Sequence, residues 1–378
     1  MTVQDTARSN GSVLEPLFSE FEVKSVGLRN RFVMAPMTRE NSPGGVPSAE
    51  NVDYYRQRAA GGVGMILTEG TLISAPAAGT SPDMPHMYGD ASAEGWRNVV
   101  NAVHAEGAAI VSQLMHMGVM RGNDSAFEPD IKSVGPSGLG ILDDRVGRPL
   151  TTADMDVVLQ SYVESATLAK TLGFDGVELH SAHGMLLDNF LWSGTNQRTD
   201  GYGGTLENRV RFPAEVVAAV REAVGSDFLL SYRFSQWKVG KYEATVASTP
   251  SELERMLNPL AQAGIDMFHP STRRHWQPAF PDADGADGRL AMAGWVKRVT
   301  GLPAIMVGSV ALDHAFIGDE ASDVQTQPDP TGLLLEQFEN NEFDLLAVGR
   351  SLLADPEWVN KMRDNDMERI VRFERQGA

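Results

Sequence analysis

Apolar residues follow two alternating patterns along most of this chain. In the first, they recur at helical spacing and the stretch ends in glycine, as in residues 154–172 followed by Gly173. In the second, a short run is rich in branched apolar residues, as in Val177-Glu178-Leu179. Because the two patterns alternate repeatedly, the sequence predicts an α/β protein in which helices connect parallel strands.

The strand pattern occurs eight times, and each occurrence precedes a segment with a helical pattern. The predicted strands are residues 31–37, 64–70, 108–115, 175–180, 228–234, 266–271, 304–309 and 345–350. Eight such repeats favour a single closed (β/α)8 barrel, the TIM barrel, over an open doubly wound sheet. The first strand is not followed by the Gly-x-Gly-x-x-Gly pattern of a dinucleotide-binding open sheet, which also favours the barrel.

Two segments interrupt this alternation. Residues 120–150 follow the third strand and residues 272–288 follow the sixth, and both contain scattered glycine, proline and aspartate. We expect both to be excursions at the carboxyl ends of strands, where barrel enzymes build their active sites. Residues 1–13 are mostly small and polar, so we expect a flexible N-terminal arm followed by one barrel domain over residues 14–378.

Charge and composition narrow the class of partner. The chain has 32 basic and 50 acidic residues, a formal charge of −18. This excess argues against nucleic acid or an anionic membrane as the partner and favours a small-molecule substrate. Cysteine is absent, which excludes disulfides, iron–sulfur clusters, thiolate metal sites and a cysteine nucleophile. We see no export signal and no apolar stretch of membrane-spanning length, so a cytoplasmic location is the default expectation.

Polar and small residues stand at the ends of seven predicted strands, and a barrel would bring these ends to one rim. Gly308 and Gly349 permit a ligand to approach the backbone closely, and the guanidinium of Arg350 is suited to a phosphate. Phosphate sites after the seventh and eighth strands are the common arrangement in barrels. The set of strand ends therefore suits a flat polar heterocycle that carries a phosphate.

His180 and His183 form the most distinctive pair in the sequence. Two histidines three residues apart, where an apolar strand ends, could ligate a metal or donate two hydrogen bonds to a substrate oxygen. A metal would need a third ligand, and Glu178 could supply it because it lies on the same strand face as His180. We favour the hydrogen-bonding interpretation and expect no metal.

Long motifs in the chain resemble those of the old yellow enzyme family of flavin-dependent ene-reductases. The run Phe174-Asp175-Gly176-Val177-Glu178-Leu179-His180-Ser181-Ala182-His183-Gly184 carries the resemblance, together with residues 195–204, 35–39, 68–70 and 348–350. The similarity extends over about residues 14–365. Because cysteine is absent, the chain is similar to the branch that bears threonine at position 38 and lacks both the cysteine and the iron–sulfur cluster of other branches.

The resemblance implies a barrel that holds FMN noncovalently at the carboxyl ends of its strands. NADH or NADPH would reduce the flavin, which would pass a hydride to the activated C=C bond of an α,β-unsaturated carbonyl or nitro compound. His180 and His183 would be the catalytic residues that hold the substrate oxygen. The residues implied to bind FMN are Pro36, Met37, Thr38, Gly70, Gln113, Arg233, Gly308, Ser309, Gly349 and Arg350.

The chain departs from the family pattern at two positions. Met185 stands where the family usually has a tyrosine that protonates the substrate, and Met115 stands where a tryptophan is frequent. We assign both to the substrate pocket, together with Tyr232 and Trp276. Met185 suggests an alternative function, a flavin-dependent dehydrogenase or oxidase that removes hydride from an amine or a saturated ketone.

Four further expectations remain open at this point. A metal-dependent barrel hydrolase or lyase that uses His180 and His183 is the alternative from another class of enzyme, and a flavin-binding protein without turnover is a third. The loop with Arg273 and Arg274 could cover the flavin, contact NAD(P)H, or present ordinary surface charges. Members of the family are often monomers or homodimers, and we expect one of these states.

Overall fold

The computed structural model describes residue 12 and residues 14–125, 127–142, 144–310, 312 and 330–373. The N-terminal arm predicted over residues 1–13 lies outside the described residues, apart from Ser12. The hydroxyl of Ser12 donates a hydrogen bond of 2.6 Å to the carbonyl oxygen of Met362, which attaches this point of the chain to its C-terminal region.

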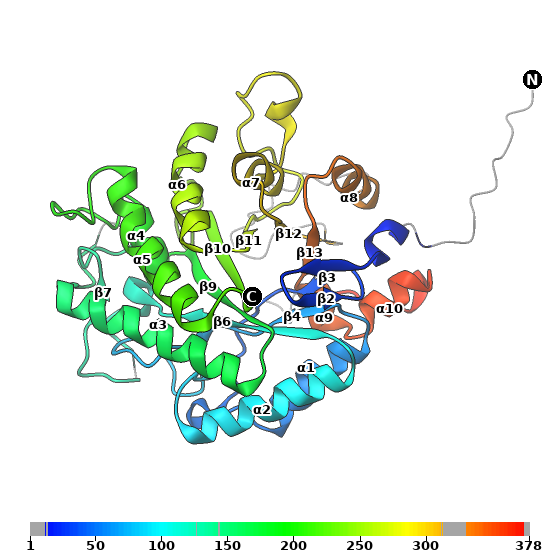
Figure 1. The fold of residues 1–378 in the computed structure, drawn as a ribbon, viewed down its shortest axis with the longest axis horizontal. Coiled ribbons are helices and arrows are strands. Elements are labelled where there is room, and N and C mark those ends of the chain that lie inside the picture. Colours follow the sequence, from blue (N-terminus) through cyan, green and yellow to red (C-terminus); the bar gives the residue numbers. More distant parts are fainter. Residues whose placement is uncertain are drawn as a thin grey trace, which may run out of the picture.

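Eight parallel strands form the barrel, as the sequence predicts (Figure 1). They are β3 (Phe32–Met34), β4 (Met65–Leu67), β6 (Ala109–Met115), β9 (Gly176–His183), β10 (Leu229–Lys238), β11 (Met267–Pro270), β12 (Ile305–Val307) and β13 (Leu345–Val348). From β3 to β11 each of these strands pairs with the next one, β12 pairs with β13, and β13 pairs with β3. Two single bridges, Phe268 with Ala304 and Ser271 with Val307, join β11 to β12 and close the ring.

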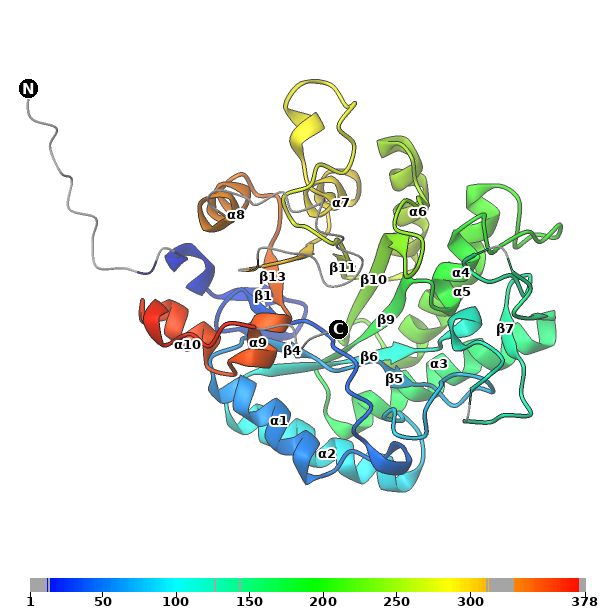
Figure 2. The ribbon, with the colours of Figure 1, turned by 180° about the vertical axis from the view of Figure 1, so that it is seen from behind.

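Helices surround the strands, as both views show (Figures 1 and 2). They are α1 (Ala49–Ala60), α2 (Asp90–Ala105), α3 (Thr152–Leu172), α4 (Leu186–Leu191), α5 (Leu206–Val224), α6 (Pro250–Ala263), α7 (Met292–Thr300), α8 (Pro330–Glu339), α9 (Arg350–Ala354) and α10 (Trp358–Arg363). Helix α6 begins as its sequence indicates, because the Thr249 side chain accepts a hydrogen bond from the Glu252 amide and Pro250 occupies the first turn. Helix α5 continues through Pro213.

Both predicted excursions are present. The first contains the short parallel pair β7 (Ser133–Gly135) and β8 (Gly147–Pro149), preceded by a 3-10 turn over Gly118–Arg121. The second contains a 3-10 turn over Gly285–Arg289 before α7 begins. A further two-residue strand, β5 (Thr71–Leu72), pairs with the end of β6. These additions all extend beyond the carboxyl ends of barrel strands, so they build up one rim of the barrel.

A hairpin that the strand count did not include closes the opposite end. It consists of β1 (Phe21–Val23) and β2 (Val26–Leu28), which pair antiparallel. Its Val23, Val26 and Leu28 pack in one cluster with the apolar residues that line the lower barrel. Lys24 at the hairpin turn forms an ion pair of 3.1 Å with Asp266, which precedes β11. The amino end of the barrel is therefore closed by apolar packing beneath this hairpin.

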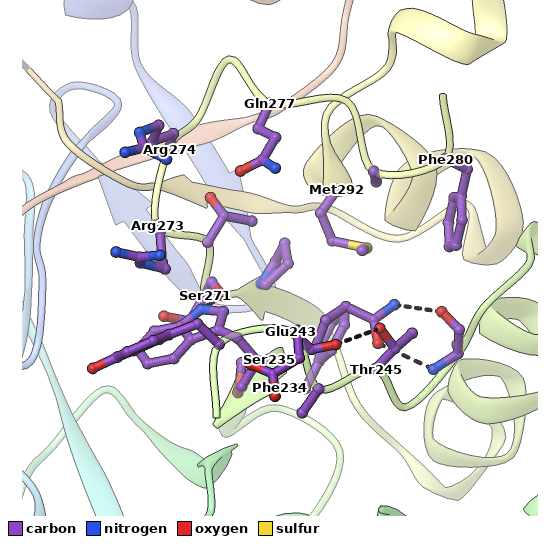
Figure 3. A pocket seen from close by; sticks show the side chains of 18 of the residues that line it. Phe234, Ser235, Glu243, Thr245, Ser271, Arg273, Arg274, Gln277, Phe280 and Met292 are labelled. Carbon is purple, nitrogen blue, oxygen red and sulfur yellow. Dashed lines mark hydrogen bonds between the residues drawn. The ribbon is translucent and has the colours of Figure 1, made fainter. Parts of the chain in front are cut away.

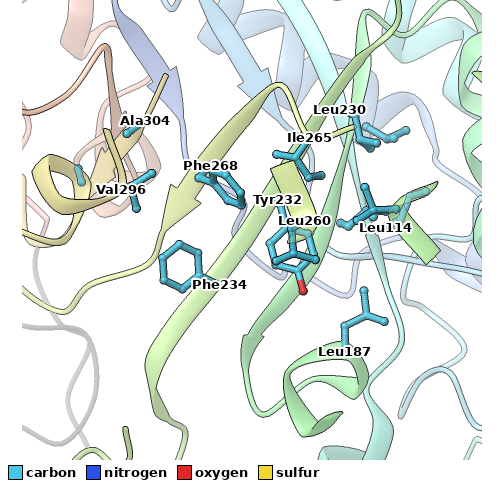
Figure 4. Close-up of a cluster of buried hydrophobic side chains, with 14 of the residues drawn as sticks. Leu114, Leu187, Leu230, Tyr232, Phe234, Leu260, Ile265, Phe268, Val296 and Ala304 are labelled. Carbon is cyan, nitrogen blue, oxygen red and sulfur yellow. The ribbon is translucent and has the colours of Figure 1, made fainter. Parts of the chain in front are cut away.

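A second apolar layer fills the space between strands and helices (Figure 4). It includes Leu230, Tyr232 and Phe234, which alternate along β10 and face the helices. Because strand side chains alternate between faces, Ser231 and Arg233 of the same strand face the barrel interior. Tyr232, which we expected in the substrate pocket, is fully buried in this outer layer, and the structure does not bring it to the barrel mouth.

Candidate active site

Two layers of polar side chains line the barrel interior beneath its carboxyl rim. The register pairs Gln113 with Glu178 and Glu178 with Ser231, which forms the lower layer. Two residues further toward the carboxyl ends of the strands, His180 pairs with Arg233 and Arg233 with His269, which forms the upper layer. Residues paired in register face the same side of a sheet, so both sets point into the barrel.

Glu178 is the centre of the lower layer. Its carboxylate, which is fully buried, accepts hydrogen bonds from Gln113 Nε2 at 2.8 Å and Ser231 Oγ at 3.0 Å. A third contact of 2.9 Å joins it to Nδ1 of His269. Burial by itself raises the pKa of Glu178, but His269, Arg233 and the hydrogen bonds outweigh it and lower this pKa to about 2. The carboxylate is therefore ionised at neutral pH.

An ionised carboxylate can only accept hydrogen bonds, and this sets the polarity of its neighbours. The amide nitrogen of Gln113 is committed to Glu178, so the amide oxygen is the atom left to face the mouth. A Cβ atom placed on Gly70 would lie 3.7 Å from that oxygen, so the oxygen is turned toward Gly70. His269 donates from Nδ1 to the carboxylate, and its Nε2 has no hydrogen-bond partner in the described part of the chain.

The upper layer contains further buried polar atoms without partners. Nε of Arg233 and Nδ1 of His180 are buried and make no hydrogen bond to any described residue. Burial lowers the pKa of Arg233 to about 10, partly offset by Glu178, so its guanidinium stays charged. Buried polar atoms are nearly always paired in native proteins. Three such atoms in one layer (the third is His269 Nε2) indicate that a polar ligand completes this site.

The two predicted catalytic histidines lie together at the end of β9. Their ring centroids are 5.4 Å apart and the rings are nearly perpendicular, at 78°. Burial, followed by the charge of Arg233, lowers the pKa of His180 to about 3 and holds that of His183 well below its ordinary value. Both imidazoles are thus neutral near pH 7, and each can donate one hydrogen bond.

Ser271 connects the histidine pair to Arg233. Its hydroxyl lies 2.8 Å from His183 Nε2 and accepts a hydrogen bond of 3.0 Å from Arg233 Nη2. Trp237 stacks on the His183 ring at 4.4 Å and donates from its indole nitrogen to the Ser271 carbonyl oxygen at 3.0 Å. Sequence reasoning did not assign Ser271 or His269, although both lie at the carboxyl end of β11 as His180 lies near that of β9.

A buried ion pair holds the turn that carries His183. Lys238 pairs with His183 across the strand ends, and its Nζ donates to Asp188 Oδ1 at 2.9 Å and to two backbone carbonyls. The other oxygen of Asp188 accepts the Gly184 amide at 2.7 Å. Both side chains are fully buried, so burial lowers the pKa of Lys238 and raises that of Asp188, while their attraction opposes both shifts. The pair stabilises a turn in which His183 has a φ of 63°.

The predicted phosphate residues come together at the ends of β12 and β13. Gly308 has a φ of 136°, and a Cβ atom there would lie 2.8 Å from the Thr272 carbonyl oxygen, so only glycine fits. Arg350 Nη2 donates to Ser309 Oγ at 3.4 Å. A Cβ atom on Gly349 would lie 3.4 Å from the sulfur of Met37, which places the segment after β3 beside this cradle.

Thr38 lies on a segment anchored by a residue that the sequence reasoning did not single out. Glu69, nearly fully buried, accepts hydrogen bonds from the backbone amides of Arg39 at 2.9 Å and Glu40 at 3.2 Å. Thr38 is exposed and Pro36 and Met37 are partly buried. The segment from 36 to 38 therefore borders the mouth at a fixed position, next to Gly70.

The substrate-pocket residues separate into two groups. Met115 is buried in a small cluster with Leu72 and Met84, and Met185 packs against that cluster. A Cβ atom on Gly70 would meet the Met115 methyl group at 2.7 Å, so Met115 lies directly against Gly70. Trp276 lies elsewhere, edge-on to His275, whose Nδ1 contacts Gln337 of α8 at 3.0 Å. The structure brings Met115 and Met185 together and leaves Trp276 apart from them.

The described residues contain no group of three histidine, aspartate or glutamate side chains that could hold a metal ion. The metal alternative would require Glu178 to converge with His180 and His183, whereas Glu178 bonds to Gln113, Ser231 and His269.

No helix in the described ranges has the length and apolar character needed to cross a membrane.

Comparison with known proteins defines the class to which this barrel and its site belong. The family model described as the NADH:flavin oxidoreductase / NADH oxidase family matches residues 16–325. The flavin oxidoreductase hxnT of Emericella nidulans is 41% identical over 367 residues, covering 93% of this chain and 92% of the relative. An NADH oxidase of Thermoanaerobacter brockii is 32% identical over 361 residues, and the chain spans only 52% of its length.

Solved structures agree with these sequence relatives. Morphinone reductase in complex with tetrahydroNAD has a TM-score of 0.74 at 30% identity, over 92% of this chain and 90% of that one. Old Yellow Enzyme from Pichia sp. AKU4542 has a TM-score of 0.78 at 25% identity, over 95% of this chain and 89% of that one. The chain belongs to the NADH:flavin oxidoreductase family that includes the old yellow enzymes, and it is an oxidoreductase of that type.

We predict that Asp188→Asn destabilises the protein by about 3–5 kcal/mol, because it leaves the ammonium of Lys238 buried without its counter-charge. Urea unfolding of the two proteins measures the difference. Asp53→Asn is the control, because Asp53 pairs with Arg56 at the surface and its loss should make no measurable difference. An Asp188→Asn protein as stable as the parent would show that the buried pair does not hold this turn.

Proposed function

We propose that this protein is an FMN-dependent oxidoreductase that uses NADH or NADPH to reduce activated C=C bonds of α,β-unsaturated carbonyl or nitro compounds. The observation that supports this most is the pair of neutral imidazoles in a barrel of the NADH:flavin oxidoreductase family. Beside and beneath them lie the two layers of buried polar side chains, here called the floor, several of whose atoms have no partner among the described residues. His180 and His183 offer donors at one edge of the mouth, and Gln113 and Arg233 offer an acceptor and a cation beneath it.

The polar atoms of the floor fit the pyrimidine end of a flavin. The amide oxygen of Gln113, turned away from Glu178, can accept from a ring N–H, and Arg233 can offset negative charge that develops on the same ring. Thr38, with Pro36, Met37 and Gly70, would border the adjoining edge of the ring. The phosphate would lie against Gly308, Ser309, Gly349 and Arg350. FMN bound there would supply the group that accepts and releases hydride.

The histidines would act on the substrate oxygen. When hydride reaches the β-carbon of an activated alkene, negative charge builds on the oxygen that activates it. Neutral His180 and His183 can each direct one N–H at that oxygen without first losing a proton. Such preorganised donors stabilise the developing charge, and removing one typically raises the barrier by about 3 kcal/mol.

Met185 favours a second candidate function. Its thioether cannot give a proton to the substrate α-carbon, and it packs beside Met115 in an apolar cluster. Removal of hydride from an amine needs no proton donor at this position, and the proton that a saturated ketone loses from its α-carbon would pass to water. For the reductive function, water would supply the proton at the α-carbon.

The visible absorbance of the purified protein is the first test of the proposed function. We expect a flavin spectrum, release of FMN on denaturation, anaerobic bleaching by NADH or NADPH, and turnover of 2-cyclohexen-1-one. The double variant His180→Ala, His183→Ala should keep its FMN and lose phenol binding and at least about a hundredfold of kcat/KM. Loss of the flavin itself would assign these histidines to cofactor retention instead.

His104→Ala is the matched control, because His104 lies on α2 and pairs with Asp175 at the surface. It should behave like the parent protein in every assay. A colourless parent protein would contradict the proposed function. Hydrogen peroxide release from an amine without any nicotinamide, combined with no enone turnover, would support the second candidate function.

Met185→Tyr restores a hydroxyl at the position of the missing proton donor. If protonation limits the reduction, we expect kcat for 2-cyclohexen-1-one to rise several-fold and the solvent isotope effect to fall. Met185→Phe has a similar ring without the hydroxyl and should leave both quantities unchanged. Equal kinetics for the tyrosine and phenylalanine variants would show that proton delivery at this position does not matter to the reaction.

A further inference from the structure

A cavity of about 500 Å³ opens beside the barrel mouth, between the loop that follows β10 and the loop that follows β11 (Figure 3). We call it the loop cavity. The residues that define it are Trp237, Tyr242, Arg273, Gln277, Phe280 and Met292. Its volume is in the range of cavities that bind small organic molecules. None of the FMN-binding residues assigned above lines it.

The loop cavity adjoins the proposed reaction centre directly. Ser271 lines it, and the hydroxyl of Ser271 also contacts His183 and Arg233. Trp237 forms part of its wall and stacks on His183 at 4.4 Å. Ser271 and Trp237 therefore form the boundary between the histidines and the loop cavity, and a molecule that reacts at the histidines and extends past this boundary would enter the cavity.

The walls of the loop cavity combine aromatic faces with a guanidinium. The rings of Trp237 and Tyr242 lie 5.9 Å apart, and the guanidinium of Arg273 lies over the Tyr242 ring at 4.5 Å. Aromatic faces stack on nucleobases, and guanidinium groups bind phosphate oxygens in a fork. Glu243 also lines the cavity and suits the hydroxyls of a sugar, although it would repel an anion placed against it.

The arginine-bearing loop is held in place. The carbonyl oxygen of Arg273 accepts a hydrogen bond of 3.0 Å from Ser309 Oγ. A Cβ atom on Gly308 would lie 2.8 Å from the carbonyl oxygen of Thr272 and 3.0 Å from the Arg274 amide nitrogen, so the loop lies directly on the end of β12. This part of the cavity wall is therefore already formed, which lowers the entropic cost of ligand binding.

We propose that the loop cavity binds the pyrophosphate and adenosine end of the nicotinamide dinucleotide that reduces the flavin, with Arg273 contacting the pyrophosphate. This inference rests on the proposed function and adds the binding site of one of its substrates. A small enone would fill only the space at His180 and His183. The dinucleotide carries in addition a purine, two sugars and two phosphates, and these are the groups that stacked rings, a carboxylate and a guanidinium recognise.

The test compares hydride donors that share the reacting nicotinamide ring and differ in what is attached to it. NADH and NADPH carry the pyrophosphate and adenosine end, here called the tail, whereas 1-benzyl-1,4-dihydronicotinamide carries a benzyl group instead. We expect Arg273→Ala to raise the KM for NADH or NADPH about tenfold or more, and to leave reduction of the flavin by the benzyl analogue within about twofold. Arg273→Lys, which keeps the charge but not the fork, should give an intermediate loss.

Binding of the tail alone provides a readout that does not depend on turnover. ADP-ribose and its 2′-phosphate, titrated calorimetrically into the flavin-loaded protein, should bind the parent and lose about tenfold in affinity in Arg273→Ala. The form that binds more tightly identifies the tail of NADH or of NADPH. The control variant is Arg298→Ala. Arg298, on α7, pairs with Asp287 of the preceding 3-10 turn at the surface, so this variant should bind both compounds like the parent.

The outcomes separate this inference from the proposed function. A parent protein whose flavin none of the three donors reduces would overturn both. If the donors reduce it and Arg273→Ala slows the benzyl analogue as much as NADH, or slows neither, the inference alone is wrong. Weakened turnover of a carboxylated enone with unchanged use of NADH and NADPH would also overturn it, and would assign the loop cavity to the oxidising substrate.

Discussion

A single buried negative charge organises the floor of this active site. Glu178 lies inside the barrel, fully shielded from water, and its two oxygens accept all the hydrogen bonds that Gln113, Ser231 and His269 direct at them. An ionised carboxylate in such a place is costly unless it is compensated, and here donors from three other strands (β6, β10 and β11) and the cation of Arg233 compensate it. The orientations of the Gln113 amide and of the His269 imidazole follow from this arrangement.

Above this floor, Ser271 and the Asp188–Lys238 ion pair hold His183 in position. Ser271 joins Arg233 to His183 and forms the boundary between the histidines and the loop cavity. The buried ion pair joins the turn after β9 to the end of β10, which keeps His183 in a backbone conformation that few residues adopt. The reacting groups thus lie at strand ends, and buried contacts and packing restrict the motion of their side chains.

The fold was predictable from the sequence because its signals are local and periodic. Eight strands, the glycine that ends α3 and the cap at Thr249 each depend on a few adjacent residues, and all are present. The β1–β2 hairpin was missed because two strands of three residues fall outside a count based on strand and helix pairs. The side-chain alternation of β10 would have placed Tyr232 outside the barrel, since Arg233 was already assigned to the interior.

The site was only partly predictable, because its remaining residues act through contacts between distant segments. Strand ends identify His180, Gln113 and Arg233, and the family resemblance names the groups that would hold FMN. Nothing local marks Asp188 and Lys238 as partners, since a charged pair inside a core has no periodic signal. Glu178 was interpreted as a possible metal ligand, and only the register of β6, β9 and β10 reveals that it orients Gln113.

Glu178→Gln tests the central claim most directly, because it keeps the size of the side chain and removes its charge. With Glu178 as the organising anion, we predict FMN affinity about tenfold weaker and a flavin reduction potential shifted upward, since less negative charge then opposes the reduced flavin. Ser231→Ala, which removes one hydrogen bond and no charge, should leave the potential unchanged. A folded Glu178→Gln protein with the FMN affinity and reduction potential of the parent would contradict this account.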